Sequence, residues 1–262
     1  EILYDIMNRF RKENKSVIFI SHDLDEIMEV CDTLTVLRDG KIIRTFEKAE
    51  FEAGAIRASM IGRELQGDYY RSDFQASSQP EVALDVRNLV YEDRLKGISF
   101  QVHKGEIVGI GGLAHCGMHS LGKVCFGALK PEEGSVTVED GTIIDSPAIA
   151  MKKRVGYVSK DRDVESLCLN ASIEDNISIA GMSEFAINNF LILKNREKKY
   201  VNHQIEELSI KCAGRDQSVS QLSGGNKQKV VFGKWIGRGS DVLILDCPTR
   251  GVDIGVKQAM YQ

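Results

Sequence analysis

The chain has 262 residues and a formal net charge of −4 at pH 7. Its hydrophobic content of 42% and charged content of 27% are typical of a globular protein, and the acidic balance argues against a nucleic-acid surface. No apolar stretch approaches the roughly 20 residues of a membrane-spanning helix. The six cysteines include no Cys-x-x-Cys pair, which favours reduced cytosolic thiols over a disulfide framework.

Residues 1–64 are predicted to form a first structural unit. Apolar side chains recur on one face of residues 1–11, which predicts an amphipathic helix. Two apolar runs, 33–37 and 41–45, flank Asp-Gly at 39–40, and Asp-Gly between alternating apolar residues is a strong β-hairpin signal. The unit also includes a predicted strand at 16–20 and a short helix through 26–30.

A polar stretch at residues 65–81 contains Ser-Ser-Gln-Pro and is predicted to be a linker. The second domain is predicted to span residues 82–262. The opening helix has no N-cap and the helical pattern at 256–262 has no C-cap, so we expect an internal segment of a longer polypeptide. The second domain is predicted to contain strands at 82–90 and 95–102, an apolar edge segment at 155–158 and a polar helical stretch from about 173 to 212.

The strongest motif is Gln-Leu-Ser-Gly-Gly-Asn-Lys-Gln at residues 221–228. Ser223 can cap the start of a helix, where backbone N–H groups and the helix dipole attract anions. Gly224 and Gly225 let a phosphate approach the backbone closely. The motif therefore predicts a nucleotide-phosphate site that extends to Gln228, although Ser-Gly-Gly alone would also fit an ordinary capped helix.

A second motif is the apolar run Val-Leu-Ile-Leu at residues 242–245, which ends in Asp246. An acid at the carboxyl end of a buried strand can hold a magnesium ion, here through water. The alternative is a strand-terminal acid that caps a turn. The next residue is Cys247, whose thiol is mostly neutral at pH 7 and is a poor base for activating water.

In this order the motifs resemble the nucleotide-binding domains of ABC transporters, in particular the ATP-binding subunits of sugar importers of the ribose and galactose type. Leu-Ser-Gly-Gly-Asn at 222–226 matches the signature motif, and 243–253 match Walker B and the D-loop, with Gly251 and Asp253 in the D-loop. The resemblance implies an α/β P-loop NTPase fold with a RecA-like core, an antiparallel β-subdomain and an α-helical subdomain. It also implies that residues 1–64 are the C-terminal part of a first such domain.

The resemblance places the Walker A loop at residues 112–119, where the pattern is Gly-x-x-x-x-Gly-Lys-Ser/Thr. Gly112 and Gly117 are present, but Met118 stands at the lysine position and His119 at the Ser/Thr position. The changes remove a charge that reaches the β- and γ-phosphates and a hydroxyl that binds magnesium. Because each lost charged hydrogen bond is worth about 1.5–3 kcal/mol, we expect this site to be degenerate.

Two other features support a degenerate site. Working domains of the family carry a glutamate at the position of Cys247, where it polarises the attacking water. His115 and Cys116 replace small residues and crowd the loop. With His119 they have a spacing that permits a metal cluster, but no fourth ligand is evident.

Three further positions have both a functional and a structural interpretation. His22, in Ile-Ser-His-Asp after an apolar strand, matches the switch histidine that contacts the γ-phosphate, or else it starts a helix. Tyr91 matches the A-loop aromatic that stacks on adenine, or else it is an ordinary strand tyrosine. Lys160 lies in the expected coupling loop, where the family usually has Gln or Glu.

Domains of this family pair head to tail, so each ATP lies between one domain's Walker motifs and the other's signature. His22 and the Ser223-Gly224-Gly225 motif would then share one composite site, whereas Met118, His119, Asp246 and Cys247 would belong to the other. The resemblance implies an ATPase that uses ATP and Mg²⁺ to energise import of a monosaccharide or related solute. Its expected partners are transmembrane permease subunits and, indirectly, an extracytoplasmic solute-binding protein, at the cytoplasmic face of the cell membrane.

Two rival functions belong to other classes. One is a soluble ABC protein acting without a permease, against which the short linker and the acidic pI of about 5.8 argue. The other is a non-catalytic or decayed domain that binds nucleotide weakly, which Met118, His119 and Cys247 favour. Because it contains no intact Walker A motif, we expect the chain by itself to have no meaningful ATPase activity.

Overall fold

The computed structural model describes residues 2–21, 24–38, 40–61, 78–113, 115–187 and 191–252. The chain divides into two compact units, one within residues 1–74 and the other within residues 75–252. The predicted switch histidine His22, the D-loop residue Asp253, most of the linker and the helical pattern at 256–262 lie outside the described residues. None of the described helices is long and apolar enough to cross a membrane.

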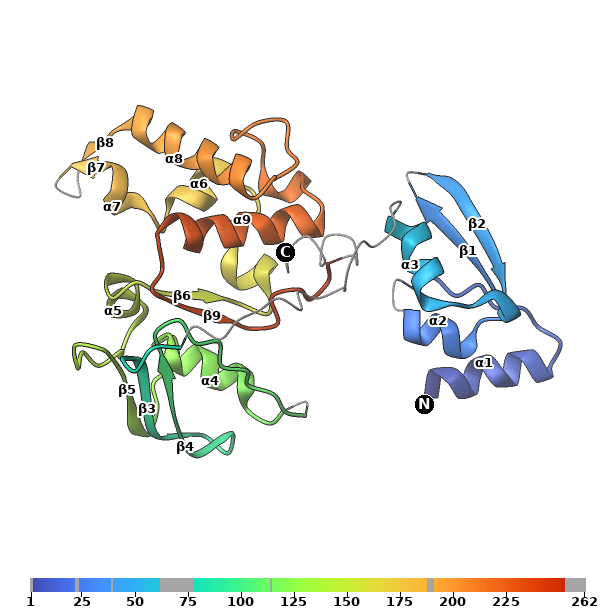
Figure 1. Cartoon of the computed structure of the whole chain (residues 1–262), viewed down its shortest axis with the longest axis horizontal. Coiled ribbons are helices and arrows are strands. Elements are labelled where there is room, and N and C mark those ends of the chain that lie inside the picture. Colours follow the sequence, from blue (N-terminus) through green and yellow to red (C-terminus); the bar gives the residue numbers. More distant parts are fainter. Residues whose placement is uncertain are drawn as a thin grey trace. The chain divides into compact units, whose positions relative to one another are not determined.

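The first unit contains the predicted hairpin, packed against a helix (Figure 1). Val36 on one strand and Phe46 on the other are almost fully buried, and they form a small core with Leu24 and Ile56 from two helices. The predicted first and second helices and the hairpin are therefore confirmed. The elements are α1 (Ile2–Lys12), α2 (Leu24–Val30), β1 (Thr33–Arg38), β2 (Lys41–Glu47), the 3-10 helix η1 (Lys48–Glu50) and α3 (Ala53–Ile61).

The strand predicted at residues 16–20 is wrong for this structure, in which the segment has no regular secondary structure. An extended segment becomes a strand only when its N–H and C=O groups pair with a neighbouring strand. Among the described residues no strand pairs with it, and the side chains of Ile18 and Ile20 are 90% and 91% exposed. The first unit therefore exposes apolar surface along this segment.

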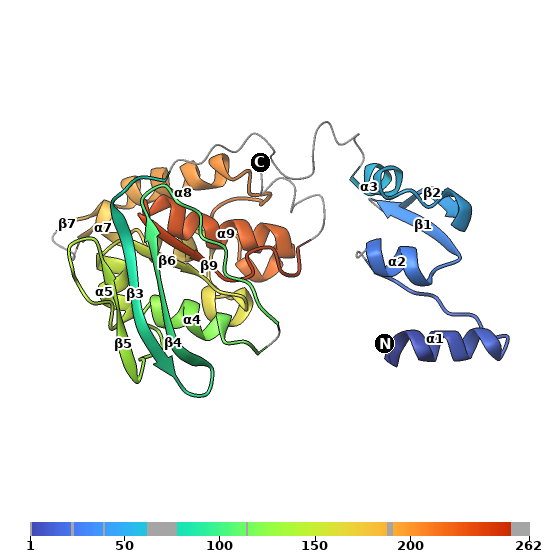
Figure 2. The ribbon, with the colours of Figure 1, turned by 60° about the horizontal axis from the view of Figure 1, so that its bottom comes forward.

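The second unit begins with an antiparallel sheet whose strand order is β4-β3-β5. The two predicted strands at its start are confirmed, and in β3 Leu84 and Val86 alternate inward, with 2% and 1% of their surface exposed. Helix α4 is adjacent to this sheet in Figures 1 and 2 and contributes Leu121, Val124 and Cys125 to the same core. These elements are β3 (Val82–Tyr91), β4 (Leu95–His103), α4 (Met118–Cys125) and β5 (Glu133–Val138).

A parallel pair of strands, β6 (Val155–Val158) and β9 (Val242–Leu245), forms the centre of the second unit. All four residues of β6 are buried, and such continuous apolar runs are typical of parallel strands covered on both faces. Helix α9 (Gly224–Gly237) packs on β6, and its Trp235 makes an edge contact with Phe126, whose ring also stacks on Tyr157. The short helix α5 (Pro147–Lys152) precedes β6.

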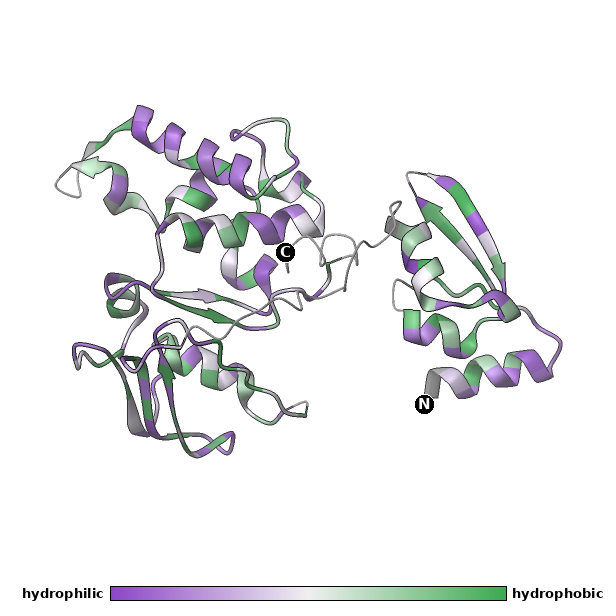
Figure 3. Ribbon diagram, in the orientation of Figure 1, coloured by the Kyte–Doolittle hydropathy of each residue, from purple (hydrophilic) through white to green (hydrophobic). Residues whose placement is uncertain are grey.

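The helical stretch predicted at about 173–212 is interrupted in the structure. Helix α6 starts at a Ser172 capping box and ends at Ser178, and a pair of antiparallel strands of two residues each separates the next short helix from α8. Figure 3 shows α8 as predominantly hydrophilic, which agrees with a helix whose polar faces meet solvent. The remaining elements are η2 (Arg162–Ser166), α6 (Ile173–Ser178), α7 (Met182–Phe185), β7 (Ala186–Ile187), β8 (Leu191–Ile192), α8 (Lys194–Glu207) and η3 (Val219–Gln221).

Candidate functional site

Ser223 is the N-cap of α9, as its position before two glycines predicts. Its Oγ accepts hydrogen bonds from the backbone N and side-chain Nδ2 of Asn226, at 3.5 and 3.0 Å. Ser223 is exposed, Gly224 is half-buried and Gly225 is buried. The helix start therefore presents a hydroxyl and backbone N–H groups, and Nη2 of Arg162 lies 3.0 Å from the place a Cβ on Gly224 would take, so the groups at this surface suit an anion.

The start of α9 is tied to two other segments by Arg162. Nη1 of Arg162 donates to Oε1 of Gln228 at 3.3 Å and to the carbonyl oxygen of Arg250 at 2.7 Å. Nη2 donates to the carbonyl oxygen of Gly251 at 3.4 Å. Gln228 is 2% exposed, so its amide faces the protein interior in this arrangement, and its nucleotide-binding role stays a prediction.

Asp246 lies at the carboxyl end of β9, and its backbone N–H donates to the carbonyl oxygen of Val158 at 2.9 Å. Its side chain is 9% exposed. One carboxylate oxygen, Oδ2, accepts a hydrogen bond from the Tyr157 hydroxyl at 3.2 Å. Burial, and next the charge of Asp246, raise the pKa of Tyr157 well above its ordinary value, so this hydroxyl keeps its proton as the donor.

His119 contacts the other oxygen of the same carboxylate. Gly117, with a φ of 95°, provides the left-handed turn that starts α4, and a side chain at Gly117 would collide with the carbonyl oxygen of Arg94. This turn directs His119 toward β9, where its Nδ1 lies 2.7 Å from Oδ1 of Asp246. Met118 precedes it on the helix and lines an apolar cavity.

Lys160 reaches the same histidine from the loop after β6. Its Nζ lies 3.1 Å from Nε2 of His119, so a chain of contacts runs from ammonium through imidazole to carboxylate. The sequence shows an unusual charge at Lys160 but gives no sign that this residue lies beside His119. In the sequence, Lys160 and His119 are only two unusual residues at separate motif positions, and nothing there indicates that they are in contact.

Cys247 follows Asp246 and has a backbone φ of 48°, which is uncommon for a residue with a side chain. Burial, then the charge of Asp246, raise the pKa of the Cys247 thiol, so it stays protonated at neutral pH. The predicted weakness of Cys247 as a base agrees with this environment. One ligand atom from each of His119, Asp246 and Cys247 lies within 4.8 Å of the others.

The Walker A loop is crowded, as the sequence predicts. A Cβ on Gly112 would lie 2.5 Å from Sγ of Cys116, and His115 has a φ of 69°. The alternative metal cluster of His115, Cys116 and His119 is not assembled, because within the described ranges His119 groups with Asp246 and Cys247.

The ABC transporter family model matches residues 95–250 of this chain. The chain belongs to the ABC transporter family. Over 263 aligned residues it is 36% identical to the Ribose import ATP-binding protein RbsA of Clostridium tetani (strain Massachusetts / E88), covering 100% of this chain and 52% of that protein. The protein of the same name from Streptococcus agalactiae serotype Ia is 38% identical with the same coverage. The chain thus spans about half the length of the curated relatives it matches.

Solved structures agree with the ABC fold. The cbiO1 protein from Clostridium perfringens, described as part of the ABC transporter complex cbiONQ, matches with a TM-score of 0.54 and 28% identity, covering 69% of this chain and 73% of that chain. The dimeric bacterial ABC transporter cassette MJ0796 matches with a TM-score of 0.57 at 17% identity, over 68% and 79% of the two chains, and supports the fold alone. The predicted ABC nucleotide-binding fold is confirmed.

Within this ABC domain the residues around Asp246 do not suit the magnesium ion that the family implies. Magnesium prefers an octahedron of oxygen ligands. Here the neighbouring groups are an imidazole nitrogen and a thiol, and both carboxylate oxygens already accept hydrogen bonds. The prediction that Asp246 holds Mg²⁺ through water is untested, and this donor set argues against it.

The predicted A-loop residue Tyr91 ends β3 and pairs with Leu95 across the turn. It is half-buried and packs against the main core. The turn that follows it contains Arg94, whose Nη1 lies 3.4 Å from Oγ of Ser120 on α4. Tyr91 is therefore near the Walker A segment in the fold, and its contact with adenine stays a prediction.

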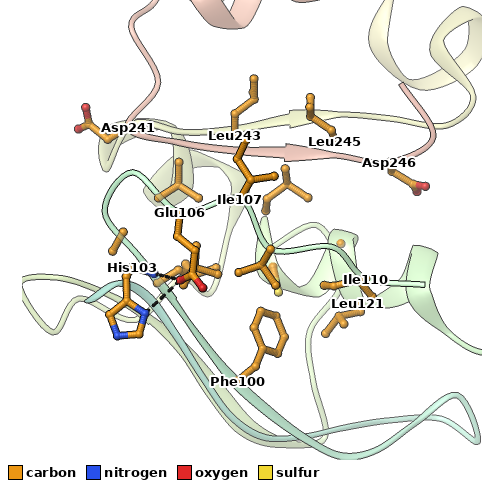
Figure 4. Close-up of a pocket in the computed structure, with 18 of the residues that line it drawn as sticks. Phe100, His103, Glu106, Ile107, Ile110, Leu121, Asp241, Leu243, Leu245 and Asp246 are labelled. Atoms are coloured by element: carbon orange, nitrogen blue, oxygen red, sulfur yellow. Dashed lines mark hydrogen bonds and ion pairs between the residues drawn. The ribbon is translucent and has the colours of Figure 1, made fainter. Parts of the chain in front are cut away.

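A cavity of about 630 Å³ lies between β4, α4 and β9. Figure 4 shows Phe100, Ile107 and Leu121 around its interior, with Asp241 and Asp246 at the two ends of β9. Its interior is apolar and does not suit a charged phosphate. The polar groups of the candidate site therefore lie at the end of the cavity next to Asp246.

Proposed function

We propose that the chain is part of an ATP-binding subunit that energises import of a monosaccharide or related solute through an ABC permease. The observation that carries the proposal is the glycine-flanked Ser223 cap of α9, in a chain that is similar along its whole length to ribose import ATP-binding proteins. ATP binding closes a domain pair, and hydrolysis reopens it. The partners are permease subunits and, indirectly, an extracytoplasmic solute-binding protein, at the cytoplasmic face of the membrane.

The domain boundaries are part of the proposal. Residues 1–64 form the end of a first nucleotide-binding domain, 65–81 the linker and 82–262 the second domain. The division into two compact units supports this arrangement. The confirmed β1–β2 hairpin and the ABC match at 95–250 support it as well.

Head-to-tail pairing would make the two ATP sites unequal. The first domain's site includes His22 and is completed by the Ser223-Gly224-Gly225 helix start, which the structure leaves exposed at Ser223. That site would bind ATP and Mg²⁺ and hydrolyse ATP. The second site has Met118 and His119 in place of the lysine and hydroxyl, and Cys247 in place of the glutamate, so it would bind nucleotide weakly at most.

The test of the competent site uses the complete subunit together with its permease in proteoliposomes. Ser223→Arg places a long cation where the γ-phosphate would lie, so we expect ATP turnover and solute uptake to fall to background. Ser220→Arg, on another exposed serine three positions earlier, is the matched control and keeps both activities. Equal loss in the two variants would contradict the proposal. Residues 1–262 alone should show only background turnover.

The degeneracy of the second site has its own test, a gain of function. Met118→Lys, His119→Thr and Cys247→Glu together restore the Walker pattern. If these three residues disable the site, the restored complete subunit binds a second nucleotide in equilibrium dialysis, and the parent protein does not. Two nucleotides bound by the parent protein would show that the site is intact.

A second candidate function is a non-catalytic ABC domain that regulates or has lost activity. The chain of contacts from Lys160 through His119 to Asp246 favours it, because it occupies the groups that would handle magnesium. Complete absence of ATP turnover in the full-length protein, with folding intact, would favour this candidate over the importer.

A further inference from the structure

We propose that His119, Asp246 and Cys247 form a site for a divalent transition-metal ion of the zinc or cobalt type. The site rests on the geometry of these three residues and not on the proposed transport function. Their Nδ1 or Nε2, carboxylate and thiol atoms lie within 4.8 Å of one another. They come from two segments far apart in the sequence, the start of α4 and the end of β9.

The donor set selects the class of metal. Imidazole nitrogen and thiolate sulfur are ligands of Zn²⁺ and Co²⁺, whereas Mg²⁺ takes oxygen ligands almost exclusively. Replacing a hydroxyl by His119 and a glutamate by Cys247 therefore changes a hard-oxygen environment into a mixed nitrogen, oxygen and sulfur one. Three protein ligands and an open position for water make a tetrahedral site.

The distance between His119 and Asp246 requires only a small adjustment. Zinc bonds of about 2.0–2.1 Å to nitrogen and oxygen place tetrahedral ligand atoms about 3.3 Å apart. Nδ1 of His119 and Oδ1 of Asp246 are now 2.7 Å apart, so they must separate by roughly half an ångström. The Tyr157 hydroxyl holds the second carboxylate oxygen at 3.2 Å and orients the acid from behind, as outer-shell partners of metal ligands do.

The backbone of Cys247 supplies an independent observation. Its φ of 48° is a left-handed conformation, which is strained for a residue with a side chain. Such conformations concentrate at functional sites. Cys247 is also exposed, which leaves the thiol a route to solvent metal and leaves room for a water ligand.

Lys160 is the cation next to His119 in the structure. Its ammonium lies 3.1 Å from Nε2 of His119 and brings one positive charge to the carboxylate through the imidazole. When Nδ1 binds a metal, Nε2 carries the ring proton and can no longer accept from Lys160. The lysine must then turn away, and the Cys247 thiol loses its proton to solvent as the sulfur–metal bond forms.

The test is a Co²⁺ titration of residues 1–262 after removal of metal, with a non-thiol reductant. We expect one Co²⁺ per chain and a sulfur-to-cobalt charge-transfer band in the near ultraviolet. Cys247→Ser should abolish the band and weaken binding at least about 100-fold, more than the loss typical of an outer-shell change. Cys168→Ser, on an exposed cysteine outside the Walker motifs, is the matched control and keeps the band.

Two further measurements make the outcome decisive. Lys160→Gln should tighten Co²⁺ binding about tenfold or more, because a positive charge near the metal is removed. Excess Mg²⁺ should not displace the cobalt, whereas Zn²⁺ should. The proposal is overturned if the parent chain shows no charge-transfer band, if the band survives Cys247→Ser, or if Mg²⁺ competes. If the complete subunit shows no solute uptake but Co²⁺ binding is retained, the result contradicts the proposed function and leaves the metal-site proposal standing.

Discussion

Nη1 of Arg162 donates to the carbonyl oxygen of Arg250 at 2.7 Å, and this hydrogen bond joins the segment after β6 to the segment after β9. The connection also runs in the opposite direction, because Nη1 of Arg250 lies 2.8 Å from Oδ1 of Asp161. A third contact from Arg162 reaches Gln228 on α9. The guanidinium of Arg162, in the predicted coupling loop, therefore connects that loop to both the D-loop and the signature helix within a single domain.

Arg162→Lys is expected to loosen this junction. Lysine cannot present the fork of donors with which arginine serves several acceptors, and the lost hydrogen bonds should lower the free energy of unfolding by about 1–3 kcal/mol. Amide hydrogen exchange at residues 249–251 should accelerate. Arg154→Lys is the matched control, since Arg154 donates to the carbonyl oxygen of Gly239 away from this junction. Unchanged exchange at 249–251 in Arg162→Lys would contradict the role.

Gly134 and Gly141 offer a matched stability test. Both have a positive φ, 85° and 77°, so an alanine at either position carries the left-handed penalty of about 1–2 kcal/mol. A Cβ on Gly134 would also collide with the carbonyl oxygens of Arg87 and Asn88, whereas nothing lies within 4 Å of one on Gly141. In urea unfolding, Gly134→Ala should therefore cost at least about 2 kcal/mol more than Gly141→Ala. Equal midpoints would refute this.

Asn176 is expected to be essential for the start of the helical subdomain. It is 3% exposed, and its amide accepts from the backbone N of Cys168 at 2.8 Å and donates to the carbonyl oxygens of Cys168 and Ser172. Asn176→Ala leaves these buried groups unpaired and should destabilise the protein by about 3 kcal/mol or more. Asn202→Ala, at an exposed position on α8, should change the unfolding midpoint little.

Stability should fall at alkaline pH because of Cys125. Burial raises the pKa of this thiol from its ordinary value of 9.0 to about 12. The folded state therefore holds the proton when the unfolded state has lost it, so stability is full below about pH 9 and declines as pH rises toward 12. Between about pH 8 and 10 the thiol accounts for a loss on the order of 1 kcal/mol.

The measurement compares urea midpoints of the parent protein and Cys125→Ala at these two pH values. The variant should lose less stability between them, by an amount on the order of 1 kcal/mol, even though the cavity makes it less stable at both. Cys116→Ala, which removes an exposed thiol, should keep the parental pH dependence. Above about pH 10 the buried Tyr157 and the half-buried Tyr200, whose pKa values burial also raises, add a loss of the same sign.

Local signals in the sequence predicted much of the fold. Asp39-Gly40 predicted the β1–β2 hairpin, the segments 82–90 and 95–102 were predicted as the strands β3 and β4, and Ser223 before two glycines predicted the start of α9. These features depend on neighbouring residues, so short-range chemistry suffices. The strand predicted at 16–20 failed because strand formation needs a partner that a local pattern cannot supply.

By itself the sequence determined the order of the ABC motifs and the substitutions at Met118, His119 and Cys247, because these are properties of residue type and spacing. Only the tertiary structure decided which of the altered residues are in contact with one another. It brings His119 from α4 to Asp246 after β9, 127 positions away, and adds Lys160 from a third segment. Such contacts depend on how α4 and the loop after β6 pack around β9, and no pattern of neighbouring residues encodes that packing.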